Sequence, residues 1–299
     1  MMGAKHRGFL LVFLGPAFVL YGLVVALPAV RALLYSLQKW NGFGDAEFVG
    51  LANFVSLFEE GSLFWAALRN NAILALAGGS GILILSLLFA SLIHRRVRGA
   101  AVFRVSFFFP NVLASVAVAL LWTLLYSTTE FGPINALLAS VQGALGIEFI
   151  QTPVTFLHTS TLTWALVPML IWTATGFYMV LFLAAMENIP ETYYEAAELE
   201  GASSWQQFRN ITLPLIREVL VVGVIFLAIT SLKIFDPIWV MESGQPQRES
   251  HVLATLVYQQ AFSEFAIGQG AAVAVVLFVL VFGISLAALR MSRREAIEY

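Results

Sequence analysis

Six long apolar stretches, free of charge or nearly so, recur along the 299-residue chain. A bilayer core of about 30 Å needs roughly 20 apolar residues in a helix, and these stretches have about that length. Each is predicted to be helical, because a lone strand in lipid would leave its backbone polar groups unpaired. The predicted spans are Gly8 to Val30, Ala72 to Ile93, Val105 to Thr129, Thr159 to Met186, Val219 to Met241 and Phe265 to Leu289. The sequence therefore predicts an all-α integral membrane protein with six transmembrane helices.

Two segments depart from this simple pattern. Lys233 and Asp236 interrupt the fifth span. Three residues apart on one helix, they would face the same side and partly neutralise each other. The segment from Pro133 to Leu145 is apolar but too short to cross a bilayer, so a helix lying at the membrane interface is predicted there.

The long polar segment between the fourth and fifth spans predicts two short helices. Pro190 suits a first helical turn, and Gly201 suits a helix end where φ is positive. Ser203 and Gln206 have the spacing of a capping box, which would open the second helix. That helix is expected to stop at Leu213-Pro214. The result would be a helix-turn-helix across the membrane surface.

Composition supports the membrane assignment and excludes several kinds of function. The chain is 60% hydrophobic and 11% charged, with a mean hydropathy of +0.85. A chain of this composition has more apolar surface than one soluble core could bury. Its net charge of -2 comes with no basic patch, so no nucleic-acid partner is expected. Cysteine is absent, which rules out disulfides, thiolate metal sites and a cysteine nucleophile.

Basic residues beside the spans predict the orientation, because positively charged loops stay in the cytoplasm. Most of them lie at the N-terminus, in the loops after spans 2 and 4, and at the C-terminus: Lys5, Arg7, Arg95, Arg96, Arg98, Arg104, Arg209, Arg217, Arg290, Arg293 and Arg294. Both termini are therefore predicted to be cytoplasmic. The first apolar stretch exceeds the core of a secretory signal, so span 1 is expected to be retained.

The cytoplasmic loop has two interpretations from its residues alone. Small Ala196, Ala197 and Gly201, set among acidic side chains, would let another backbone approach and would attract basic groups. That favours a docking surface. Alternatively, the loop is a solvated linker that only joins two spans.

The spacing in this loop resembles the EAA loop of the membrane subunits of binding-protein-dependent ABC importers. The residues that carry the resemblance are Glu195, Ala196, Ala197, Gly201, Ile211, Leu213 and Pro214. The resemblance implies a type I ABC importer permease fold. It also implies that Glu195 to Gly201 is a coupling helix, seated in a cleft of a nucleotide-binding subunit and moved when the ATPase dimer closes.

Further segments resemble the carbohydrate-uptake branch of that family, of which the maltose transporter is the well-known example. They are Val49 to Phe54, Arg69-Asn70, Phe103-Arg104, Phe109-Pro110, Gly132 to Leu138 and Phe235 to Trp239. Met241 to Pro246 departs from the usual "LTxGGP". The chain looks like the first, F-type subunit. The implied partners are a second homologous permease, two copies of an ABC ATPase and an extracytoplasmic solute-binding protein.

Motifs for catalysis in this chain are missing. There is no Gly-x-x-x-x-Gly-Lys-Ser/Thr phosphate loop, and Gly78 to Gly81 has no lysine after it. His-Glu-x-x-His and Gly-x-Ser-x-Gly are also absent, so no catalytic or metal-binding residue is assigned. ATP and Mg are expected to be bound by the partner ATPase.

Polar residues of the fifth span are candidates for the translocation path. Ser231, Lys233, Asp236 and Trp239 could offer hydrogen bonds and a stacking surface to a sugar. Alternatively, the charged pair sits near the outer interface and only fixes the depth of the span. Four other aromatic residues are either interface anchors or sugar contacts: Trp122, Tyr126, Trp164 and Trp172.

Two other classes of protein remain open from the residues. A secondary transporter driven by an ion gradient would also show several spans and a few intramembrane charges. A membrane receptor or scaffold would use the loop only to bind a partner. Residues 1–65 are expected to form an N-terminal span and outer loop, 66–290 the transport core, and 291–299 a cytoplasmic tail.

Overall fold

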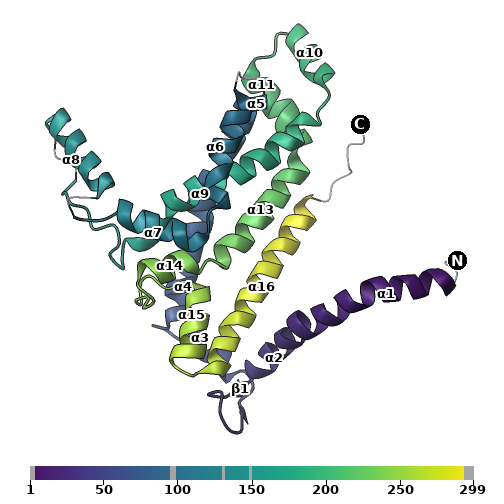
Figure 1. Ribbon diagram of the computed structural model, residues 1–299, viewed down its shortest axis with the longest axis vertical. Helices are drawn as coiled ribbons and strands as arrows, with labels where there is room; N and C mark the ends of the chain where they lie inside the picture. The colour runs from purple at the N-terminus through teal and green to yellow at the C-terminus, as the bar shows by residue number, and fades with distance from the viewer. Residues whose placement is uncertain (1–3, 95–98, 130–131, 148–149, 293–299) are drawn as a thin grey trace. The chain divides into compact units, whose positions relative to one another are not determined.

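The apolar stretches form helices in the computed structural model, which describes residues 4–94, 99–129, 132–147 and 150–292 (Figure 1). Contacts divide the chain into two units. One consists of Met1–Phe64 and Leu256–Val279, and the other of Trp65–Thr255 and Leu280–Tyr299. Each unit therefore combines segments that are far apart in the sequence.

The first unit contains long helical segments and a small hairpin. Its elements are α1 (Ala4–Tyr21), the π-helical turn η1 (Gly22–Ala26), α2 (Leu27–Tyr35), β1 (Gln38–Lys39), β2 (Glu47–Phe48), α3 (Ala52–Phe58), the π-helical turn η4 (Gln259–Ser263) and the first half of α16 (Ile267–Ser292). The strands are antiparallel and pair Gln38 with Phe48. The Asn53 amide donates to the carbonyl oxygens of Ser36 and Gln38, both at 2.9 Å. These bonds fasten α3 to the start of the hairpin.

The second unit holds most of the helices. They are α4 (Leu63–Ile73), the π-helical turn η2 (Leu74–Gly78), α5 (Gly79–His94), α6 (Ala100–Val112), α7 (Ser115–Leu125), α8 (Pro133–Leu145), α9 (Leu162–Glu187), α10 (Glu191–Leu199), α11 (Ser204–Gln207), the π-helical turn η3 (Phe208–Thr212), α12 (Leu213–Leu215), α13 (Arg217–Leu232), α14 (Asp236–Met241), the first half of α15 (Leu253–Tyr258) and the second half of α16. Figure 1 shows α5, α6 and α13 alongside α9, with α10 and α11 beyond one end. Helix α8 has the predicted bounds, and its place at an interface stays a prediction.

Helix α9 is central to the packing of this unit. Phe182, Met179 and Met186 are fully buried in an apolar cluster that α5 and α13 also line. The Ser86 hydroxyl of α5 donates to the Thr175 carbonyl of α9 at 2.9 Å. At Gly176 a Cβ would lie 1.9 Å from the Phe107 carbonyl oxygen, so α6 and α9 touch backbone to backbone. Close packing and a buried hydrogen bond thus join α5 and α6 to α9.

The predicted number of spans is confirmed, with one change of shape. Within the described residues, five helices are long and apolar enough to cross a membrane, and there are six spans if one bent pair counts as a span. That pair is α6 and α7, bent by 97°. The third span, predicted as Val105 to Thr129, is therefore two helices with a bend between them rather than one continuous helix. Pro110 lacks an N–H and crowds the preceding turn, and the backbone becomes extended at Leu113 and Ala114.

The fifth span is also interrupted, which overturns one prediction. Helix α13 ends at Leu232 and α14 begins at Asp236, so Lys233 and Asp236 do not share a helix. Within the described chain no ion pair joins the two side chains, and both are exposed. Pro237 explains part of the break, because it has no N–H to donate to the Lys233 carbonyl four residues back and its ring crowds that carbonyl.

The loop between the fourth and fifth spans folds as two helical segments, but its second segment runs further than predicted. Helicity continues from Ser204 through η3 and past Pro214 to Leu215. The π-helical turn precedes Pro214 and shifts the backbone hydrogen bonds there, which accommodates a residue without an N–H. The expected stop at Leu213-Pro214 is therefore wrong, and the break comes at Ile216.

Candidate functional site

Helix α10 ends in a Schellman motif that explains the spacing of the small residues. The Ala202 N–H donates to the Ala197 carbonyl at 2.9 Å, and the Gly201 N–H donates to the Glu198 carbonyl at 3.0 Å. Gly201 has φ of 77°, which confirms the predicted positive φ. The motif requires a left-handed residue four positions after Ala197, whose carbonyl accepts from Ala202. Glycine fits this position because it has no Cβ.

The turn after Gly201 is fixed by side chains as predicted. The Ser203 N–H donates to the Gln206 side-chain oxygen at 2.7 Å, and the Gln206 N–H donates to the Ser203 hydroxyl, which completes the capping box. The Tyr194 and Thr212 hydroxyls lie 3.0 Å apart and join α10 to η3. The two helical segments therefore form one defined surface.

The surface of this loop presents the predicted coupling residues together with large apolar side chains. Glu195, Ala196, Gly201 and Pro214 are exposed, and Ala197, Ile211 and Leu213 are partly covered. Leu199 is 91% exposed and Trp205 is 65% exposed. Sequence reasoning missed Leu199 and Trp205, although the apolar residues of a polar helix were the available signal.

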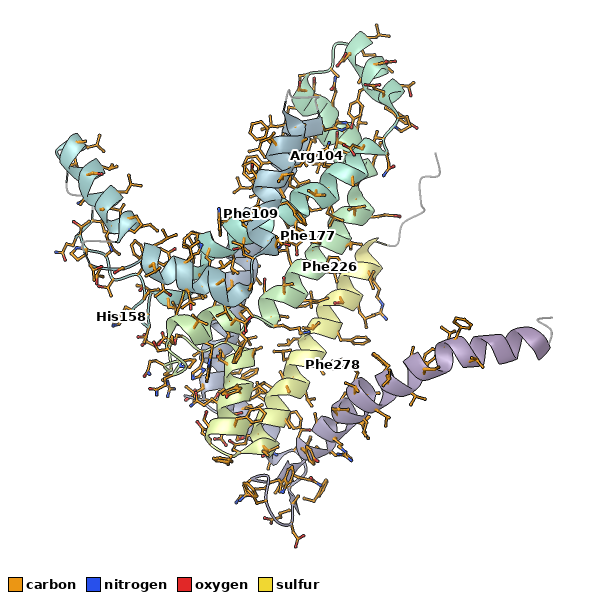
Figure 2. All side chains as sticks on the ribbon, viewed as in Figure 1. Arg104, Phe109, His158, Phe177, Phe226 and Phe278 are labelled. Carbon is orange, nitrogen blue, oxygen red and sulfur yellow. The ribbon has the colours of Figure 1, made fainter. Side chains whose placement is uncertain are left out.

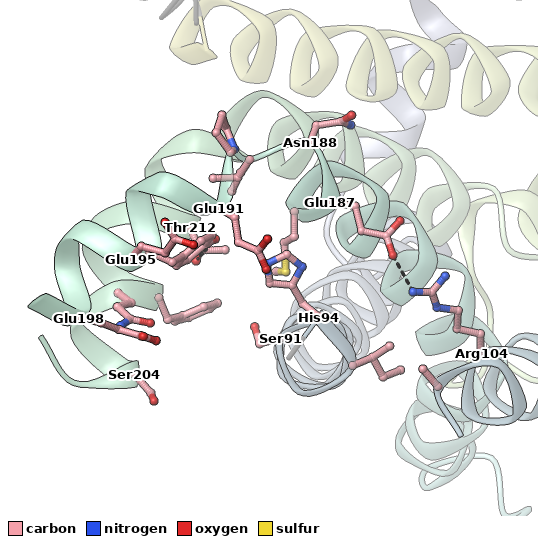
Figure 3. A pocket seen from close by; sticks show the side chains of 18 residues that line it. Ser91, His94, Arg104, Glu187, Asn188, Glu191, Glu195, Glu198, Ser204 and Thr212 are labelled. Carbon is pink, nitrogen blue, oxygen red and sulfur yellow. Dashed lines mark hydrogen bonds and ion pairs between the residues drawn. The ribbon is translucent and has the colours of Figure 1, made fainter. Parts of the chain in front are cut away.

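A cavity of about 990 Å³ lies behind α10. Glu191, Glu195 and Glu198 line it from the loop, and His94 lines it from the end of α5 (Figure 3). At its edge the Arg104 guanidinium forms an ion pair with the Glu187 carboxylate at 2.6 Å, which joins α6 to the end of α9. Both side chains are about half exposed, so this pair stabilises the contact only slightly.

A second cavity, of about 680 Å³, lies where the third and fifth spans are broken. Ser231, Lys233 and Asp236 line it, so three of the four predicted path residues are brought together. Trp239 does not line this cavity in the described chain, but its ring stacks on Phe235, which does, at 5.3 Å between centroids. We call this space the transport cavity after the predicted path residues that line it, and the fifth span forms one of its walls.

Other residues of the transport cavity were not foreseen. Aromatic rings come from α9 and α13 at Phe177, Tyr178 and Phe226, of which the first and last are labelled in Figure 2. Polar groups come from the other breaks and helices, at Asn111, Ser115, Thr173 and Thr230. Sequence position gives little signal for them, because they come from four segments that only the fold brings together.

The four aromatic residues predicted as anchors or sugar contacts lie away from the transport cavity. They are Trp122, Tyr126, Trp164 and Trp172. The Tyr126 hydroxyl donates to the Ala165 carbonyl at 2.7 Å, and Tyr126 is buried. Trp122 packs against Tyr126 and Trp172, while Trp164 is exposed. None of them lines the transport cavity among the described residues.

Comparison with known proteins identifies the family. Residues 82–291 match the family model described as "Binding-protein-dependent transport system inner membrane component". The chain belongs to this family. A probable ABC transporter permease protein of Pyrococcus horikoshii is 32% identical over 91% of this chain and 91% of its own length. The probable starch degradation products transport system permease protein AmyD of Thermoanaerobacterium thermosulfurigenes is 30% identical over 96% and 94%.

The fold is that of this family of inner membrane transport components. A chain of a bacterial alginate ABC transporter, solved with a pentasaccharide-bound periplasmic protein, matches with a TM-score of 0.79. It is 23% identical, and the match covers 98% of this chain and 96% of that one. This likeness confirms the predicted permease fold. The family match and the long apolar helices support a multi-pass membrane protein. The family match also includes the whole α10–α12 loop and nearly all of the transport cavity.

Proposed function

We propose that this chain is the permease subunit of an ATP-driven importer that carries a sugar or sugar-like solute into the cytoplasm. One observation carries the proposal. The same helix, α9, lines the transport cavity with Thr173 and Phe177 and ends at Glu187, just before the exposed helix α10. A force on α10 therefore reaches the cavity wall through a single packed helix.

The loop surface fits a protein partner that hydrolyses ATP. Helix α10 offers acidic side chains and a very exposed Leu199, which a free surface would leave in contact with water. In this proposal α10 sits in a cleft of the ATPase, and closure of two ATPase copies pulls α10 inward. ATP and Mg are bound by those copies, and this chain supplies no catalytic residue.

The transport cavity fits a solute with both apolar faces and hydroxyl groups. Aromatic rings such as Phe177 and Phe226 offer flat apolar surface, and Thr173, Thr230 and Ser231 offer hydroxyl groups. A relative is named for starch degradation products, which agrees with such a solute. A second homologous permease would complete the pathway, and an extracytoplasmic binding protein would deliver the solute.

Orientation follows from the same proposal. The α10–α12 loop and both termini lie in the cytoplasm, where ATP is available. The loop that contains α8 and the turn after α14 then lie outside, where a binding protein docks. This agrees with the basic residues near the cytoplasmic ends of the spans.

Transport assays separate this proposal from a secondary transporter. The complete complex is reconstituted in vesicles with its binding protein, and uptake of a labelled maltodextrin mixture is measured. We expect uptake to require ATP on the side of the membrane where α10 lies. Uptake should continue when ionophores collapse the ion gradients. Uptake that follows an ion gradient without ATP would overturn the proposal. So would a purified chain that brings down no ATPase.

A further inference from the structure

The side chain of Asn71 bridges three segments of the second unit. Its amide nitrogen donates to the Ser231 carbonyl at 2.7 Å and lies 3.4 Å from the Leu232 carbonyl. Its amide oxygen accepts from the Leu253 N–H at 2.8 Å. Asn71 is fully buried. One side chain of α4 thus holds the end of α13 and the start of α15.

The bonds to α13 satisfy a need that the break in the fifth span creates. A helix end leaves its last carbonyl groups without intrahelical donors. Because α13 ends at Leu232, inside a segment long and apolar enough to span the membrane, lipid cannot supply those donors. The Asn71 amide supplies donors to the last two carbonyl groups of α13, those of Ser231 and Leu232.

The residues next to these carbonyl groups are those that line the transport cavity. Ser231 belongs to the last turn of α13, and Lys233 and Asp236 follow it across the break. Ser231 is only 8% exposed, although it lines the cavity. The position of this wall therefore depends on the backbone that Asn71 holds.

We propose that Asn71 is a positioning residue for transport, which fixes the broken fifth span so that Ser231, Lys233 and Asp236 face the solute. This inference rests on the proposed function, because it takes the cavity to be the solute path. Asn71 does not line the cavity itself and acts through the carbonyl groups it binds.

The neighbouring residue gives a matched control. The Asn70 amide donates to the carbonyl oxygens of Glu249 and His251 at 2.7 and 2.8 Å, and Asn70 is also buried. These bonds hold the loop before α15 and do not reach the break. Asn70→Asp and Asn71→Asp thus remove the same amide donors from adjacent buried positions, and only the second affects the fifth span.

The experiment uses the absence of cysteine in the chain. Ser231→Cys places one thiol on the cavity wall, and its reaction with a small water-soluble methanethiosulfonate is timed in the assembled complex. With Asn71→Asp we expect the rate to rise about tenfold, because a lost buried hydrogen bond shifts a local opening equilibrium by about that factor. With Asn70→Asp we expect less than a twofold change, because the bonds that it removes go to Glu249 and His251 and not to the fifth span.

Transport activity distinguishes positioning from a general loss of stability. Asn71→Asp is expected to lower solute uptake severalfold while the complex still hydrolyses ATP, since the α10–α12 loop is untouched. If the aspartate variant does not assemble, Asn71→Ser is measured instead. Its hydroxyl keeps one donor, so an intermediate thiol rate is expected.

Several outcomes would overturn the inference. These are an unchanged thiol rate in both Asn71 variants, an equal effect in Asn70→Asp, failure of both Asn71 variants to assemble, and a parallel fall of uptake and ATP hydrolysis. Failure of the proposed function looks different. In that case Asn71→Asp changes the thiol rate, but uptake does not depend on ATP or on Asp236.

Discussion

Replacing Gly201 tests whether the end of α10 has to keep its left-handed turn to bind the ATPase. Gly201 has φ of 77°, and a Cβ at this position would meet nothing within 4 Å in this chain. Gly201→Val therefore causes no clash within the chain. It acts through the backbone, where a left-handed conformation costs a residue with a Cβ about 1–2 kcal/mol.

That cost sets the size of the expected effect. Since 1–2 kcal/mol corresponds to a factor of roughly 5–30 in an equilibrium, Gly201→Val should weaken association with the ATPase by up to that factor. Gly201→Asn is the control, because asparagine adopts this conformation more readily and should bind more tightly than the valine variant.

Association is measured by titrating the purified ATPase against the chain in nanodiscs, with ATP-driven uptake as a second readout. Two results would refute the reasoning. Normal association and uptake in Gly201→Val would show that the turn is not needed. Equal losses for valine and asparagine would show that the partner excludes any side chain, so that contact rather than backbone geometry decides.

Three further predictions concern other parts of the second unit. Gly176→Ala should lower stability by about 1–3 kcal/mol in thermal unfolding, because its Cβ would overlap the Phe107 carbonyl oxygen, while Gly79→Ala, with open space, should not. Asp236→Leu should reduce uptake at normal expression, since it removes an exposed carboxylate from the transport cavity, and unchanged uptake would contradict that role. Burial raises the pKa of the Glu242 carboxyl above its ordinary value. The folded state therefore gains stability from the protonated carboxyl at a pH below the ordinary glutamate pKa, and it loses this stability as pH rises through the raised pKa. Glu242→Gln should flatten that dependence in unfolding measured against pH.

The turns of the α10–α12 loop could be predicted from sequence because their determinants are local. Gly201 and Ala197 belong to one Schellman motif, and Ser203 and Gln206 to one capping box, so a few neighbouring residues specify each turn. The length of the second helical segment was not foreseen. A proline usually ends a helix, but the π-helical turn η3 let this one continue past Pro214.

The sequence by itself determined the spans, the loop between the fourth and fifth of them, and the polar residues of the fifth span. Apolar runs, caps and turns act over a few residues, so their chemistry is visible in the order of residues. Only the tertiary structure decided that Lys233 and Asp236 sit on opposite sides of a break, and that Asn71 supplies the hydrogen bonds at its edge. Asn71 and Ser231 are 160 positions apart in the chain. A buried hydrogen bond between such distant residues depends on the packing of whole helices, which no local pattern records.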